Sequence, residues 1–241
     1  MLPTLSDLQR ANLVLPESQW EKSVPPVHAR GIRSTYYRAL VQSGVVGAIC
    51  TRDFIANVVV PITAAAKVSW WAVVPNEYRG KCNAFVSHAW YDMFIRENPR
   101  GVALTLALEA DRDPELFFWM DAFCLNQHTE ITGLTPTLHK TLQEAGTVYV
   151  TISDYALFDR SWCMYELASA IRMDGVTLCA RVGKPACSLE DYYSGQPQSA
   201  QAFDKRDKEQ IDATILKEYG SWDEFDKLLY HFVERTSPMY L

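Results

Sequence analysis

Two hydrophobic patterns divide the chain, and one gives way to the other near residue 83. From there on, short apolar runs of strand length alternate with segments in which apolar residues recur at helical spacing. This alternation is typical of βα units wound around a parallel sheet. The predicted strands are AFVS (84–87), LFFWMD (116–121), TVYVTI (147–152) and GVTLCARV (175–182). The helices predicted between them cover 101–110, 134–145 and 161–173, each long enough for a parallel crossover.

The first 80 residues show a different pattern. Their second half has helical apolar spacing, with Pro61 as a break or kink, and Pro75 and Gly80 bracket a polar stretch before the first strand. We expect this N-terminal extension to be mainly helical, and to cover a helical face or to control self-association. The expected parts are the extension (1–80), an α/β domain (81–200) and C-terminal helices that pack on that domain (201–241).

Composition narrows the classes of function. The chain has 241 residues, 48% of them hydrophobic, which is enough to bury a substantial core. Its formal net charge is −6 and it contains no run of Lys or Arg, so we expect no nucleic-acid partner. The six cysteines are scattered and form no CxxC pair, which favours reduced thiols in a cytoplasmic protein over a disulfide framework.

Membrane insertion is also not expected. The first 20 residues lack the basic start and apolar run of a signal peptide. The most apolar stretch, 54–74, is interrupted by Asn57, Pro61 and Lys67, so it falls short of the roughly 18 uninterrupted apolar residues that a spanning helix needs. We interpret this stretch as a buried or interface helix, with a membrane-inserted or membrane-interfacial role as the alternative.

Polar and aromatic side chains follow three of the predicted strands directly. In an open parallel sheet, ligands bind outside the carboxyl ends of the strands, because the βα loops and helix N-termini converge there. We therefore expect the three loops to form one binding edge. The candidate residues are Ser87, His88, Trp90, Tyr91 and Asp92 after the first strand, Asp121 and Asn126 after the second, and Trp162 and Glu166 after the third.

Glu166 lies on the helix that is predicted to begin near Ser161, a plausible N-cap. The apolar face of that helix includes Cys163 and Leu167, whereas Glu166 shares a row with Trp162 by i, i+4 spacing. The carboxyl group is therefore expected at the loop edge and not in the core. The alternative is a surface glutamate that the helix dipole favours.

The order of these motifs resembles the TIR (Toll/interleukin-receptor) domain family. FVSH with Asp92 corresponds to the family's F-I-S-Y strand and its following Asp, and FFWMD through Gly133 corresponds to the second strand and its glycine-containing loop. SDYALFDRSWCMYEL corresponds to S-x-x-Y followed by W-C-x-x-E-L, and the resemblance covers about residues 82–182. It implies a flavodoxin-like open parallel sheet flanked by helices.

The chain departs from the TIR pattern at several points. His88 replaces the usual tyrosine, the second loop lacks the family's Pro-Gly element, and a fifth strand is not evident. WMDAFCLNQ is also similar to the W-I-D-x-x-C-I-N-Q element of fungal heterokaryon-incompatibility (HET) domains, which are themselves TIR-like.

TIR domains include enzymes that cleave the nicotinamide–ribose bond of NAD+ and scaffolds that only associate with one another. The enzymes carry a glutamate at the position that Glu166 matches, so the resemblance implies an NAD+ nucleosidase, with NAD+ as a substrate and not a bound cofactor. The chain has no G-x-G-x-x-G loop, which agrees with a consumed substrate. An ionised Glu166 would stabilise the oxocarbenium-like ribose, and family enzymes often complete the site by homo-oligomerisation.

A non-catalytic TIR/HET-like association module is the main alternative. It would act in intracellular signalling of the immune or cell-death type. In it, tryptophans, tyrosines and the loop 126–133 would form a protein interface.

Two other chemistries stay open from the residues alone. Cys124 and His128 are spaced i, i+4 and, with a further His or Cys, would provide zinc ligands. A nucleophile activated by histidine would pair Cys163 with His88, or Ser87 with His128.

Overall fold

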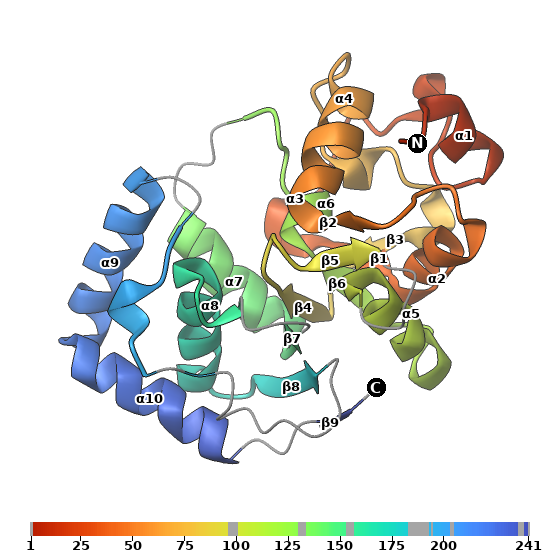
Figure 1. Cartoon of the computed structure of the whole chain (residues 1–241). Coiled ribbons are helices and arrows are strands. Elements are labelled where there is room, and N and C mark those ends of the chain that lie inside the picture. The colour runs from red at the N-terminus through yellow and green to blue at the C-terminus, as the bar shows by residue number, and fades with distance from the viewer. Residues whose placement is uncertain are drawn as a thin grey trace.

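The computed structural model describes residues 2–95, 101–129, 134–152, 157–182, 193, 195–202, 205–235 and 239–240. Within these residues a seven-stranded sheet has the order β3-β1-β6-β4-β7-β8-β9 (Figure 1). Its parallel strands are β4 (Ala84–Ser87), β6 (Phe117–Trp119), β7 (Thr147–Ile152), β8 (Thr177–Val182) and β9 (Met239–Tyr240). Counted along the chain, these five have the order 2-1-3-4-5, which is that of flavodoxin-like sheets. The predicted α/β class with a mostly parallel sheet is confirmed.

The helices between the parallel strands occur where the sequence predicts them. They are α5 (Val102–Arg112), α7 (Leu134–Ala145), α8 (Ser161–Arg172), and then α9 (Lys205–Tyr219) and α10 (Trp222–Arg235) between β8 and β9. Figure 1 shows α7 and α8 on one side of the central strands and α5 on the other, with α9 and α10 outside α8. The predicted second strand, 116–121, is shorter in the structure because Asp121 already begins the short helix α6 (Asp121–Cys124). None of the described helices is long and apolar enough to span a membrane.

The first 95 residues contain short elements. They are α1 (Leu5–Arg10), β1 (Arg30–Arg33), α2 (Ser34–Ser43), β2 (Ile49–Cys50), α3 (Thr51–Phe54), a π-helical segment (Ile55–Val59), α4 (Val60–Thr63), β3 (Arg79–Lys81) and β5 (Met93–Ile95). Short 3₁₀ turns occur at Glu17–Gln19, Val27–Ala29, Trp70–Ala72 and Asn76–Tyr78, and again at Pro197–Ser199. Pro61 lies inside the continuous helical stretch 51–63, and β2 pairs with β5 in a second, two-stranded sheet.

Strands β1 and β3 were not predicted, because the sequence analysis expects mainly helices in this part. β1 pairs antiparallel with β6 and with β3, so the N-terminal residues extend the central sheet. Gly31 and Gly80 face each other across this pair, and a Cβ at either position would lie within 3 Å of Phe117 atoms. The absence of side chains at these two positions therefore lets Phe117 pack against the backbone. The domain boundary near residue 80 stays a prediction.

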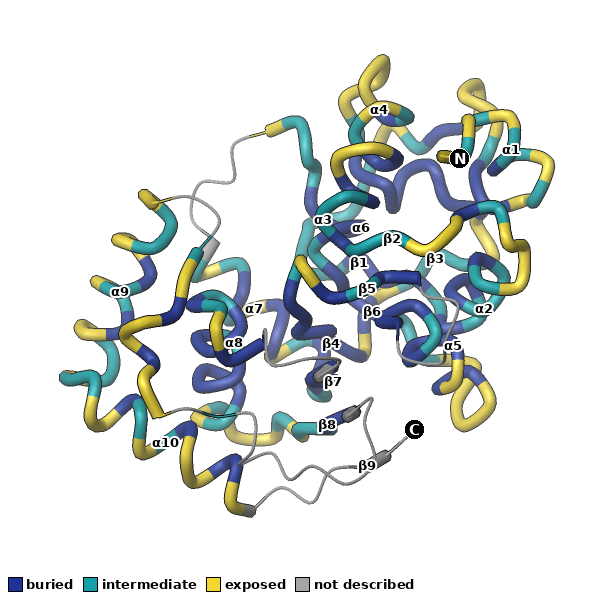
Figure 2. Tube along the Cα trace, in the orientation of Figure 1, coloured by how far each residue is buried: buried dark blue, intermediate teal, exposed yellow. Residues whose placement is uncertain are grey.

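Buried residues from all parts of the chain form one hydrophobic core. Figure 2 shows them concentrated along β4, β7 and α8, with exposed residues on the outer sides of α9 and α10. Phe123 of α6 is in ring contact with aromatic residues of the preceding segment, at centroid distances of 5.7 to 6.2 Å: Tyr36, Tyr37, Phe54, Trp70 and Phe94. This aromatic cluster attaches the N-terminal part of the chain directly to α6.

Candidate functional site

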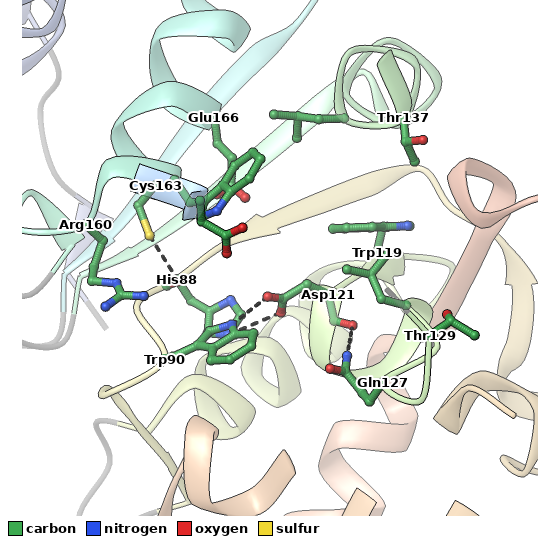
Figure 3. Close-up of a pocket in the computed structure, with 14 residues that line it drawn as sticks. His88, Trp90, Trp119, Asp121, Gln127, Thr129, Thr137, Arg160, Cys163 and Glu166 are labelled. Atoms are coloured by element: carbon green, nitrogen blue, oxygen red, sulfur yellow. Dashed lines mark hydrogen bonds and ion pairs between the residues drawn. The ribbon is translucent and has the colours of Figure 1, made fainter. Parts of the chain in front are cut away.

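A cavity of about 300 Å³ lies beside the carboxyl ends of β4 and β6, next to the first turns of α7 and α8 (Figure 3). Its lining residues are His88 and Trp90; Trp119, Asp121, Leu125, Gln127 and Thr129; Thr137 and Leu138; Arg160, Trp162, Cys163 and Glu166; and Asp207. Five of the nine candidate residues from the sequence therefore line one cavity, namely His88, Trp90, Asp121, Trp162 and Glu166.

Glu166 and Ser87 form the centre of the site. The Ser87 hydroxyl, which is fully buried, donates a 2.7 Å hydrogen bond to Glu166 Oε2. Burial raises the pKa of Glu166 to about 8, although the Ser87 hydrogen bond lowers it, and the nearby Asp121 raises it further. In the ligand-free protein at pH 7 the Glu166 carboxyl is therefore mostly protonated, whereas the sequence analysis expects an ionised group.

Asp121 is held in a fixed orientation at the opposite wall. Trp90 Nε1 donates a 2.6 Å hydrogen bond to its Oδ2, and the backbone N–H of Ala122 donates to its Oδ1 at 2.6 Å. The same Oδ1 lies 3.6 Å from His88 Nε2, as the dashed lines in Figure 3 indicate. Burial lowers the pKa of His88, and Asp121 opposes that shift only in part, so the imidazole is neutral at pH 7.

Three indoles line the cavity. Trp119 stacks on Phe85 with ring centroids 4.9 Å apart, and its Nε1 donates to the carbonyl of Val27 at 2.9 Å, which fixes the ring. Trp162 contacts Tyr165 edge to face at 6.3 Å. Together with Trp90 they give walls that suit a flat, aromatic ligand group.

Arg160 and Asp207 line the cavity but are not among the sequence candidates. Arg160 is the residue before α8, and its guanidinium carbon lies 5.6 Å from the ring centroid of Tyr91. Within the described residues it makes no ion pair. Its position in the sequence, directly before the helix that carries Glu166, could have identified it as a candidate site residue. Asp207 lies on α9, far along the chain, and no local pattern points to it.

Ser161 is not the N-cap that the sequence suggests. Helix α8 already includes Ser161, its N-cap is Arg160, and no side chain caps it. The Ser161 hydroxyl instead donates to the carbonyl of Ala200 at 3.0 Å, and its backbone N–H donates to Gln201 O at 3.0 Å. These bonds attach the segment before α9 to the start of the helix that carries Glu166.

Four candidate residues do not line the cavity. Ser87 lies behind the cavity wall and donates a hydrogen bond to the lining residue Glu166. Tyr91 is half exposed and lies between the guanidinium groups of Arg52, at 5.0 Å, and Arg160.

Asp92 and Asn126 are held by the N-terminal part of the chain. Asp92 is buried, and its carbonyl accepts from the backbone N–H of Thr51 at 3.0 Å. Asn126 Nδ2 donates to the carbonyl of Lys67 at 2.8 Å. Both are predicted from the sequence to contact substrate, but neither lines the cavity. Asp154, Tyr155 and Gly133 of the TIR-like motifs lie outside the described residues.

The two candidate nucleophile pairs do not form. The Cys163 thiol donates to the backbone carbonyl of His88 at 3.2 Å, and burial raises its pKa well above that of a free thiol. Ser87 is bonded to Glu166, while His128 Nε2 lies 2.8 Å from Thr63 Oγ1. The described residues also contain no group of three or more His, Cys, Asp or Glu side chains that would hold a metal ion.

No protein-family model, curated protein or solved structure matches this chain. The resemblance to TIR and HET domains stays a prediction from the motifs. Function is inferred from that resemblance and from the cavity, which combines a buried carboxyl group, neutral hydrogen-bonding groups, indole walls and an arginine.

Proposed function

We propose that this protein is an NAD+ nucleosidase, a hydrolase that cleaves the nicotinamide–ribose bond. The observation that carries the proposal is the Glu166 carboxyl, which Ser87 holds inside an indole-lined cavity at the carboxyl end of the sheet. In the reaction the C–N bond breaks and its electron pair goes to nicotinamide, which leaves as a neutral molecule. Positive charge then develops on the ribose, and water adds there and releases a proton.

The raised pKa of Glu166 suits a cationic substrate. The nicotinamide ring of NAD+ carries a positive charge, and such a charge close to Glu166 lowers its pKa and favours the carboxylate. The carboxylate then stabilises the oxocarbenium-like ribose in a site where little water weakens the interaction. Glu166 is thus protonated in the empty site and ionised when the cation is bound.

The size of the cavity favours one half of the dinucleotide. Its volume of about 300 Å³ is at the lower end of small-molecule pockets. It suits the nicotinamide and its ribose, with the ring packed on an indole. Arg160 would then face the negatively charged phosphates.

Release of nicotinamide from NAD+ by the purified protein tests this function. Glu166→Gln keeps the shape of the side chain and removes the charge, so we expect at least a 100-fold loss of turnover. Glu224→Gln is the matched control, because Glu224 is exposed on α10 and pairs only with Lys227 among the described residues. Undiminished release by a folded Glu166→Gln variant contradicts the assignment.

Self-association belongs to the same proposal, through the resemblance to TIR domains. We expect turnover to rise more steeply than linearly with protein concentration. If the folded protein releases no nicotinamide at any concentration, the non-catalytic association module becomes the better interpretation.

A further inference from the structure

His88 Nε2 is a buried nitrogen with no hydrogen-bond partner in the described part of the chain. The side chain is only 2% exposed, and it lines the cavity. Burial lowers the pKa of the ring more than Asp121 and the Val86 backbone raise it, so the ring is neutral. We assign the ring proton to Nδ1, so that the neutral ring presents the lone pair of Nε2 to the cavity.

Asp121 Oδ1 is a second acceptor at the same place. Both carboxylate oxygens already accept hydrogen bonds, one from Trp90 and one from Ala122, so the group is fixed as an acceptor. The distance of 3.6 Å between Oδ1 and His88 Nε2 is too long for a hydrogen bond between them. Two acceptors therefore lie side by side on the cavity wall. Nε2 has no donor, which is costly for a buried acceptor, and Oδ1 can accept one more hydrogen bond besides that from Ala122.

A ligand with two adjacent donors would satisfy both groups. The two hydroxyls of a sugar cis-diol lie next to each other, and each can donate one hydrogen bond. The Trp90 indole, which donates to Asp121, adds an apolar surface for the C–H groups of a sugar ring. Figure 3 shows His88, Trp90 and Asp121 grouped on this wall, and Glu166 approaches the same cavity from α8.

We propose that His88 Nε2 and Asp121 Oδ1 form a binding site for the vicinal diol of a ribosyl group, with one hydroxyl donating to each atom. Applied to NAD+, which rests on the proposed function, this diol is that of the nicotinamide-bearing ribose. His88 is here a binding residue that selects ribosides over deoxyribosides, and Asp121 completes the pair. Sites built to hydrogen-bond a hydroxyl discriminate strongly against analogues that lack it.

The test measures binding and not turnover, so it is separate from the test of the proposed function. Carbocyclic NAD+, which cannot be cleaved at this bond, is titrated into the wild-type protein by calorimetry, beside its 2′-deoxy and 3′-deoxy forms. We expect each deoxy form to bind about 10- to 100-fold more weakly. The ¹⁵N resonance of His88 Nε2 should shift with the parent compound and less with the form that lacks its donor.

Two variants locate the effect. His88→Ala should bind the parent compound about 10-fold more weakly or worse, and should lose most of its preference over one deoxy form. His88→Gln, which can place an amide oxygen near the position of Nε2, should restore part of that preference. Equal binding of all three compounds by the wild-type protein overturns the proposal, as does an undiminished preference in His88→Ala.

The remaining outcomes separate the two proposals. Selective binding of the diol without any release of nicotinamide from NAD+ supports the binding site and contradicts the nucleosidase. Release of nicotinamide without selectivity supports the nucleosidase and overturns the diol site. If carbocyclic NAD+ does not bind at all, the diol site is wrong.

Discussion

At the scale of single residues, Glu166 departs far from the ordinary chemistry of a glutamate. Glu166 is partly exposed and lines the cavity, and the Ser87 hydroxyl donates a hydrogen bond to its carboxyl group. Burial, more than any neighbouring charge, raises its pKa. Such perturbed groups are frequent in active sites, where a protein gives up stability for function.

We therefore predict that Glu166→Gln changes how stability depends on pH. Between the unfolded pKa of 4.5 and the folded pKa of about 8, the unfolded chain releases the proton of Glu166 while the folded protein retains it. The free energy of unfolding thus falls as pH rises through this window, by up to about 5 kcal/mol from this residue, and the Gln variant lacks this loss. Urea unfolding from pH 5 to 8.5 measures both proteins, and parallel curves contradict the prediction.

Ser87→Ala should shift the pH dependence of catalysis. The Ser87 hydrogen bond lowers the pKa of Glu166, so its removal raises that pKa further. We expect the rising limb of kcat/KM, which reports the free enzyme, to move to higher pH. Ser169→Ala on the same helix is the control, since Ser169 is buried but does not line the cavity. An unchanged limb in Ser87→Ala would show that Glu166 does not control the profile.

Helical spacing was sufficient to predict that Trp162 and Glu166 lie on one side of their helix, and both line the cavity. The hydrogen bond between Ser87 and Glu166 joins positions 79 residues apart. The rule that strand ends in a parallel sheet converge predicts both residues at one edge, but not this bond. Asp207 reaches the cavity through the packing of α9 on α8, and such contacts between distant helices have no local signature.

At the scale of elements, the strands that the sequence predicts best are those buried on both faces. The predicted bounds of β4 and β7 agree with the structure residue for residue, because continuous apolar runs are typical of central parallel strands. β1 has the sequence RGIR, with a single large apolar residue, and its strand conformation depends on β6 and β3 as partners. Strand preference of this kind is set by tertiary context and is not visible locally.

Helix α6 links the N-terminal part of the chain to the site. Asp121 begins this helix, and Phe123, two residues on, is surrounded by aromatic rings from residues 36–94. The Arg30 guanidinium also donates to the carbonyl of Cys124 at 2.7 Å. The orientation of Asp121 therefore depends on packing that the first 95 residues provide.

We predict that Phe123→Leu weakens both stability and substrate binding. The smaller side chain leaves a gap in the aromatic cluster, with an expected loss of about 1–2 kcal/mol in the free energy of unfolding. Because α6 can then shift, KM for NAD+ should rise several-fold. Phe225→Leu on α10 removes an equally buried ring outside the cavity and should affect stability alone. Equal KM values in the two variants would argue against a link between α6 and the site.

At the scale of the whole molecule, a buried ion pair joins the helix layer to the sheet. Glu109 of α5 accepts two hydrogen bonds from Arg181 of β8, at 2.8 and 3.1 Å, and both side chains are at most 3% exposed. The Arg181 guanidinium also lies 5.1 Å from the ring centroid of Tyr149 on β7. Removal of one partner leaves a buried charge uncompensated, whereas apolar replacement of both does not.

Glu109→Leu should therefore lower the free energy of unfolding by about 3–5 kcal/mol, while the double variant Glu109→Leu/Arg181→Met should cost clearly less. Neither residue lines the cavity, so the folded variants should release nicotinamide at the wild-type rate. Chemical denaturation of both variants checks the energies. Additive losses in the double variant would mean that the two charges do not depend on each other.

The antiparallel pairing of β1 with β6 has a consequence for biosynthesis. Arg33 pairs with Phe117, which follows it by 117 − 33 = 84 positions. At a translation rate of roughly 5–20 residues per second, β1 therefore leaves the ribosome about 4–17 s before its partner strand exists. The rings that will surround Phe123 precede it by 29 (Phe94) to 87 (Tyr36) positions, which corresponds to about 1–17 s. The part of the chain that is synthesised first is thus among the last to reach its folded contacts. Until then, the apolar N-terminal segment of the nascent protein stays exposed to aggregation.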